Sequence, residues 1–188
     1  MPELSPWILA TGVLLFVLVL TLLQRPRMQL ERGVPRQLRG AQIVLQEKSV
    51  RSLALGLVAK PDRVYQVGGE LVVVELKTRP QPRVYESDRI ELSVQRAVLE
   101  AERRAPVSRR GWVLTHDPRD GKRTALRVDL MDRDELLALR DRYHALLAGR
   151  TAPMPARSVR QCEQCAYLQQ CQQDFGDRYV APSRGSLK

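Results

Sequence analysis

The chain has 188 residues, which suits one domain of ordinary size with short additional segments. Its 31 Lys and Arg residues outnumber 21 Asp and Glu, and the net charge of +10 favours a polyanionic partner, either nucleic acid or an acidic lipid surface. The three cysteines all lie between positions 162 and 171, which argues against a disulfide framework and points to a metal instead.

The first predicted element is a membrane anchor, the uncharged apolar run from Trp7 to Leu23, which is close to the shortest length that spans a bilayer. A secretory signal peptide would carry basic residues before this run, but the preceding segment contains Glu3 and no Lys or Arg. Arginines follow the run instead. The positive-inside rule therefore predicts that the anchor crosses the cell membrane with the amino terminus outside and the rest of the chain in the cytoplasm. We therefore expect a transmembrane anchor over residues 1–24 and a basic juxtamembrane linker over 25–42. A cleaved signal and a buried helix are the alternatives.

The remaining elements predict an α/β core over residues 43–150, followed by a cysteine-containing C-terminal segment and tail over 151–188. Pro153 and Pro155 separate the two. In chain order we expect a strand or short helix over 41–47, an apolar segment over 52–58, a hairpin over 63–74, a helix over 87–103, strands over 111–116 and 123–130, and an amphipathic helix over 132–147.

The hairpin carries the most informative residues. Gly68-Gly69 suits a two-residue turn of the primed type, because such a turn needs positive φ. With this turn, residues that face each other have numbers that sum to 137, so Asp62 lies opposite Glu75 with Cβ atoms roughly 5 Å apart. Lys77 lies two residues beyond Glu75 and therefore projects from the same face of the strand.

Two facing carboxylates need a compensating cation, because like charges directly opposite each other destabilise a sheet. Mg²⁺ and Mn²⁺ fit this requirement, since they take one or two carboxylates together with water and phosphate oxygens. Lys77 would then orient or deprotonate a water, or stabilise the charge that grows on a scissile phosphate. The alternative interpretation is an exposed hairpin whose charges are solvated.

Pro61-Asp62 followed by Glu75-x-Lys77 resembles the motif of the PD-(D/E)XK nuclease superfamily. Residues 88–102 resemble the helix that follows the catalytic strand in RecB-like nucleases, and the cysteine tail, Cys162-x2-Cys165-x5-Cys171, resembles the C-terminal cluster of the CRISPR-associated Cas-four exonucleases. The resemblance covers roughly residues 33–175. It implies a restriction-endonuclease-like core, in which helices flank a mixed sheet. It also implies metal-dependent cleavage of DNA ends, often on single strands, and an iron–sulfur cluster.

The resemblance also implies roles for particular residues. Asp62 and Glu75 would bind Mg²⁺ or Mn²⁺, together with the backbone carbonyl of Leu76. Lys77 would position the attacking water, and Glu47 is the candidate for a further metal ligand that the family often has upstream. The substrate-binding candidates on the helix are Glu91 and Gln95. Independently of the resemblance, the positive charges of Arg79 and Arg96 make them candidates for contacts to the phosphate backbone, with solvated surface charges as the alternative.

The chain departs from the family pattern on the helix and at the cysteines. Glu91 stands where family members usually carry Gln, and Gln95 stands where they carry Tyr. Val34 stands where a fourth cysteine is expected, and four thiolates are the usual set for a 4Fe–4S cluster. A cluster on the cysteine tail alone is therefore incomplete, labile, completed by another group or absent, and a structural zinc ion would also lack a fourth donor. Alternatively, the cysteines pack as small apolar residues.

Three hypotheses follow. The leading one is a membrane-anchored, metal-dependent DNA exonuclease. The second is a nuclease-fold module without turnover that binds DNA or a protein partner at the membrane. The residues at 91 and 95 and the missing fourth cysteine favour it. The third is an anchored redox or metal sensor built on the cysteine tail. We interpret His116 and His144 as surface or partly buried histidines and not as ligands.

Overall fold

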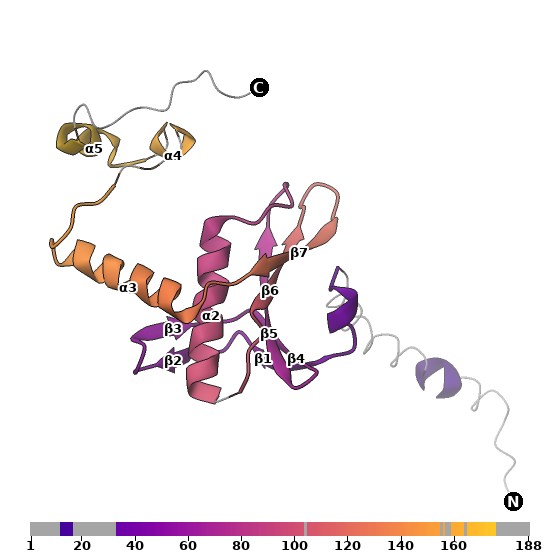
Figure 1. Cartoon of the computed structure of the whole chain (residues 1–188). Helices are drawn as coiled ribbons and strands as arrows, with labels where there is room; N and C mark the ends of the chain where they lie inside the picture. Colours follow the sequence, from indigo (N-terminus) through magenta and orange to yellow (C-terminus); the bar gives the residue numbers. More distant parts are fainter. Residues whose placement is uncertain are drawn as a thin grey trace, which may run out of the picture. The chain divides into compact units, whose positions relative to one another are not determined.

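The computed structural model describes residues 12–16, 33–103, 105–154, 156, 159–163 and 165–175 (Figure 1). The chain divides into two compact units, Met1–Leu137 and Ala138–Lys188. Most of the predicted membrane anchor lies outside the described residues; only 12–16 are described, as a helical segment. Within the described part of the chain, no helix has the length and apolar character needed to cross a membrane.

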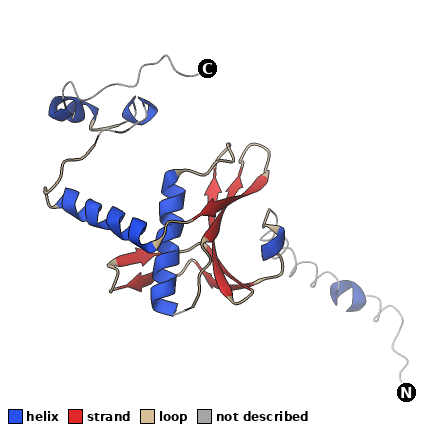
Figure 2. Ribbon diagram, in the orientation of Figure 1, coloured by secondary structure: helices blue, strands red, loops and turns tan. Residues whose placement is uncertain are grey.

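A five-stranded mixed sheet forms the centre of the first unit, with the strand order β1-β4-β5-β6-β7 (Figure 2). Its strands are β1 (Gln42–Gln46), β4 (Arg63–Val67), β5 (Glu70–Thr78), β6 (Arg110–His116) and β7 (Arg123–Asp129). Only β5 and β6 are parallel within this sheet, and the other neighbours are antiparallel. The segment 41–47, for which the sequence left strand and helix open, forms β1.

Helix α2 (Glu86–Arg103) is the crossover that a parallel β5–β6 pair requires. A second, two-stranded sheet pairs β2 (Val50–Ser52) with β3 (Leu57–Ala59), and α2 contacts both of these strands. The prediction of an α/β fold with a mixed sheet is confirmed, as are the hairpin, the helix after it and the strand pair β6–β7.

Apolar side chains cover both faces of the sheet. On the α2 face they form a cluster of Leu45, Val64, Leu71, Val73, Leu92, Leu99, Val107, Val113, Val128 and Leu130. On the opposite face, the short 3-10 helix η1 (Arg36–Leu38) contributes to a cluster of Val34, Leu38, Tyr65, Val72, Val74 and Leu114. The central strand β5 sends residues into both clusters, which explains its unbroken apolar run, Leu71 to Val74.

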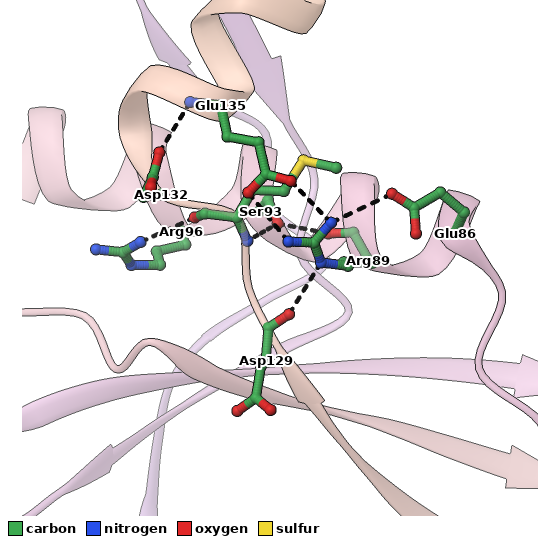
Figure 3. Close-up of polar contacts among 8 residues, drawn as sticks. Glu86, Arg89, Ser93, Arg96, Asp129, Asp132 and Glu135 are labelled. Atoms are coloured by element: carbon green, nitrogen blue, oxygen red, sulfur yellow. Dashed lines mark hydrogen bonds and ion pairs between the residues drawn. The ribbon is translucent and has the colours of Figure 1, made fainter.

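Polar contacts hold the segment after β7 against α2 (Figure 3). Ser93 Oγ accepts the Met131 N–H at 2.9 Å, and Arg96 donates to the Met131 carbonyl at 3.1 Å, so both backbone groups of Met131 are satisfied. Arg89 forms two parallel bonds of 3.0 Å to the Glu135 carboxylate. These contacts set where helix α3 (Arg133–Leu147) begins in the first unit.

Candidate active site

The register of the β4–β5 hairpin brings the predicted carboxylates together. Gly68 and Gly69 have φ values of +54° and +88°, as a primed turn needs. Arg63 pairs with Val74 and Val67 pairs with Glu70, so facing residues sum to 137 and the predicted register is confirmed. Asp62 precedes the first paired residue of β4 and therefore lies at the position opposite Glu75.

The Asp62 carboxylate is oriented by the backbone of the neighbouring strand. Its Oδ2 atom accepts a hydrogen bond of 2.8 Å from the Leu76 N–H. The donor belongs to the residue after Glu75, so the bond holds the two acids at the same end of the hairpin. Asp62 is half-buried, whereas Glu75 is 4% exposed.

Glu75 is a buried acid with two polar partners. Its Oε1 atom lies 2.9 Å from Lys77 Nζ, and its Oε2 atom accepts a bond of 2.8 Å from Gln95 Nε2. Burial raises the pKa of Glu75 to about 7, and the charges of Asp62 and Glu91 add to this effect, although Lys77 and Gln95 oppose it. Burial therefore disfavours the ionised form of this carboxylate, and a bound cation would favour it.

Lys77 lies between two acids. Its Nζ atom is 2.9 Å from Glu75 and 2.8 Å from Glu91, which comes from α2. Desolvation lowers the pKa of Lys77, but the hydrogen bonds to Glu91 and Glu75 outweigh it and raise the pKa above its ordinary value. Lys77 is thus an ammonium ion at neutral pH. In this arrangement it can stabilise negative charge or orient a water, but it cannot accept a proton.

Gln95 is 2% exposed and joins α2 to the site through Glu75. Its Oε1 atom is buried and has no hydrogen-bond partner among the described residues. A buried acceptor of this kind costs free energy unless a donor or a cation meets it. The sequence indicated this position on the helix but gave no sign that its amide would hold Glu75.

These oxygen donors fit a divalent cation in part. Asp62 and Glu75 supply two carboxylates, and the Gln95 Oε1 atom is a hard donor with unmet bonding capacity. No three His, Cys, Asp or Glu side chains within the described ranges are grouped closely enough to hold a metal. Mg²⁺ does not need three, because it commonly keeps several waters and binds phosphate oxygens besides one or two carboxylates.

The structure does not bring the predicted further ligand, Glu47, into such a group. Its side chain is exposed and its backbone N–H donates to the Pro61 carbonyl at 2.9 Å, so its backbone lies beside the Pro61-Asp62 motif. Glu47 has a φ of +49°. A further ligand role for Glu47, and one for the Leu76 carbonyl, remain predictions from the family resemblance.

The two predicted phosphate-binding arginines are engaged in contacts within the fold. Arg79 lies 2.7 Å from the buried carboxylate of Asp88, which also accepts the Tyr85 N–H at the start of α2. Arg96 is 12% exposed in its side chain and bonds the Met131 carbonyl. These contacts assign both arginines a structural role, and substrate binding by either one stays a prediction.

The cysteine tail lies in the second unit. Cys162 in α4 (Val159–Glu163) is buried, Cys165 is exposed, and Cys171 in α5 (Leu168–Phe175) is half-buried. All three thiols are free, and among the described residues they form no group that could hold a metal. Val34, at the position of the expected fourth cysteine, is 2% exposed in the core of the first unit. The predicted iron–sulfur or zinc site therefore gains no support from this arrangement.

One comparison with known proteins, the match to a family model, agrees with the hairpin motif. A family model described as the PD-(D/E)XK nuclease superfamily matches residues 17–172. No curated protein matches the sequence. Among solved structures, the crystal structure of SSO0001 is similar with a TM-score of 0.45 and 13% identity, over 80% of this chain and 67% of that chain. A similarity of that size supports no statement about activity.

Proposed function

Because the chain belongs to the PD-(D/E)XK nuclease superfamily, we propose that it is a metal-dependent nuclease that hydrolyses phosphodiester bonds of DNA. The observation that carries the proposal is the convergence of Asp62, Glu75 and Lys77 at one end of the β4–β5 hairpin. The Asp62 carboxylate is held by the Leu76 N–H at 2.8 Å, and Lys77 lies 2.9 Å from Glu75.

Each residue has a defined part in the proposed reaction. A bound Mg²⁺ or Mn²⁺ supplies Lewis-acid polarisation of the phosphate and a more acidic water in such sites. Asp62 and Glu75 hold the ion, and Gln95 keeps the Glu75 carboxylate in place. Lys77 is positively charged, so it stabilises the charge that develops on the phosphate and orients the water without removing its proton.

Glu91 distinguishes this site from the family pattern described above. The Glu91 carboxylate lies 2.8 Å from Lys77 Nζ and competes with Glu75 for it, and the Glu91 side chain is 45% exposed. A substrate phosphate that approaches Lys77 must compete with this exposed carboxylate. Turnover is therefore slower than it would be with a neutral residue at position 91.

The finer parts of the proposal rest on the sequence. Exonuclease activity on DNA ends and the relation to the RecB-like, CRISPR-associated Cas-four family are supported by the order of hairpin, helix and cysteine tail. Anchoring in the cell membrane, with the nuclease core in the cytoplasm, is supported by the apolar run 7–23 and the arginines after it.

A cleavage assay tests the proposal. The purified full chain is incubated with Mg²⁺ or Mn²⁺ and with single-stranded or duplex DNA labelled at the 5′ or 3′ end; circular DNA serves to detect internal cuts. We expect metal-dependent cleavage that Lys77→Ala lowers by about 100-fold, the usual loss for one preorganised charge-stabilising group. Lys122→Ala, at an exposed turn residue, is the control. Absence of cleavage with both metals, or equal rates for Lys77→Ala and the parent, contradicts the proposal.

A second candidate function is a DNA-binding module without turnover. The pairing of Lys77 with Glu91 favours it, because this ion pair occupies the ammonium that cleavage needs. DNA binding without cleavage in either metal, together with cleavage restored by Glu91→Gln, would select this function and identify the ion pair as the cause.

A further inference from the structure

A hollow in the first unit lies where β5 and β6 end and β7 begins. Its volume is about 180 Å³. It is lined by Arg63, Leu76, Lys77, Thr78, Leu114, His116 and Arg123, which we call the basic pocket. Strand pairing builds it, because Leu76 pairs with Leu114, Thr78 with His116, and His116 with Arg123.

The basic pocket belongs mainly to the sheet face opposite α2. Leu76 and Thr78 alternate with Glu75 and Lys77 along β5, so their side chains point to the other face. Leu114 and Leu76 belong to the apolar cluster on the η1 face. Lys77 is the exception: it lines the pocket, but its ammonium group pairs with Glu75 and Glu91 on the α2 face.

The chemistry of the lining suits an anion. Apart from Lys77, three of the lining residues, Arg63, His116 and Arg123, are basic, and the described lining includes no Asp or Glu. The neighbouring Asp117 is held by Arg119, with contacts of 2.7 Å from Nη2 and 2.9 Å from the backbone N–H, so its charge is compensated. The volume is well above what one water needs and leaves room for one phosphate group.

We propose that the basic pocket binds a phosphate group of a nucleic-acid strand, next to the phosphate that is cleaved. This inference rests on the proposed nuclease function. Both places lie at the carboxyl end of β5, so a strand that crosses the carboxyl ends of β5 and β6 places one phosphate at Asp62 and Glu75 and a neighbouring one in the pocket. Carboxyl ends of parallel strands are the usual place for ligands in α/β sheets.

A binding experiment on the full chain tests the pocket separately from catalysis. Fluorescence anisotropy with a labelled single-stranded oligonucleotide in EDTA measures affinity without cleavage. Arg123→Gln removes one basic side chain from the pocket, and Arg127→Gln is the matched control because both arginines are exposed on β7 and only Arg123 lines the pocket. One lost phosphate contact lowers the salt slope by about 0.7, which corresponds to about fivefold weaker binding at 0.1 M salt. We expect this for Arg123→Gln and less than a twofold change for Arg127→Gln.

A second measurement does not depend on DNA. The chain contains two histidines, and only His116 lines the basic pocket. Titration with inorganic phosphate, at ionic strength matched with chloride, is expected to shift the ring NMR signals of His116 saturably and to leave those of His144 unchanged. Arg123→Gln should require several-fold more phosphate for the same shift.

The outcomes separate the two proposals. Equal DNA affinities for Arg123→Gln and Arg127→Gln, in a protein that cleaves DNA, overturn the pocket and leave the nuclease intact. If a soluble short-chain phosphatidylglycerol shifts the His116 signals saturably, and Arg123→Gln abolishes this shift while leaving the DNA affinity unchanged, the pocket proposal is also overturned and a lipid phosphate is identified as the ligand. A parent protein that neither binds nor cleaves DNA removes both proposals together.

Discussion

Glu75→Gln is expected to stabilise the metal-free protein while it abolishes cleavage. Glu75 is 4% exposed, and burial raises its pKa from 4.5 to about 7. The ionised form is thus disfavoured in the fold, so Glu75 lowers the stability of the native state as the pH rises from 4.5 through 7. Glutamine has nearly the same shape and carries no charge. Its oxygen can accept from Lys77, and its NH2 group can donate to Gln95 Oε1, which has no partner among the described residues, if the Gln95 amide turns over.

The pKa shift gives the size of the effect. One pKa unit corresponds to about 1.4 kcal/mol, so a shift from 4.5 to about 7 makes the ionised Glu75 unfavourable by about 2 to 3 kcal/mol at pH 8. At pH 5 the same reasoning gives a cost of less than about 1 kcal/mol for Glu75 in the native state. Glu75→Gln should therefore raise the free energy of unfolding at pH 8 and change it little at pH 5.

Denaturant unfolding of the full chain in EDTA, at both pH values, measures this difference. Glu70→Gln, at an exposed position of the same hairpin, controls for the loss of one negative charge. Added Mg²⁺ should raise the free energy of unfolding of the parent and so reduce the difference in stability between the parent and Glu75→Gln, because a ligand that binds the native state stabilises it. If Glu75→Gln is less stable than the parent at pH 8 in EDTA, the neighbours of Glu75 compensate its charge well and Glu75 does not need a cation.

Two further substitutions test the helix that closes the site. Glu91→Gln should raise kcat/KM on DNA several-fold, because Lys77 then loses one of its two acidic partners; a decrease would mean that Glu91 itself takes part in metal or water binding. Ser93→Ala should lower the free energy of unfolding by about 1 to 2 kcal/mol, because the Met131 N–H loses its acceptor in a buried place. Chemical denaturation measures this, and Ser87→Ala at an exposed position of α2 should change stability by less than about 0.5 kcal/mol.

The arginines show a limit of reading charges along the chain. The sequence predicts that Arg79 and Arg96 contact phosphate, because an excess of positive charge favours a polyanion. In the fold, Arg79 pairs with Asp88 and Arg96 bonds the Met131 carbonyl, while Arg123 lines the basic pocket. Charge is a property of one residue, but whether it faces solvent, a buried acid or a pocket depends on packing between distant segments.

The placement of Asp62 opposite Glu75 followed from the sequence alone. A two-residue turn with positive φ at both glycines sets the pairing of its own flanking strands, so Gly68-Gly69 carried all the information that this register needed. The partners of the site did not follow from the sequence. The contacts of Glu91 with Lys77 and of Gln95 with Glu75 depend on how α2 returns across the sheet, and the basic pocket depends on the parallel register of β5 and β6. Those arrangements join residues 14 to 60 positions apart, and only the packing of the whole core brings them into contact.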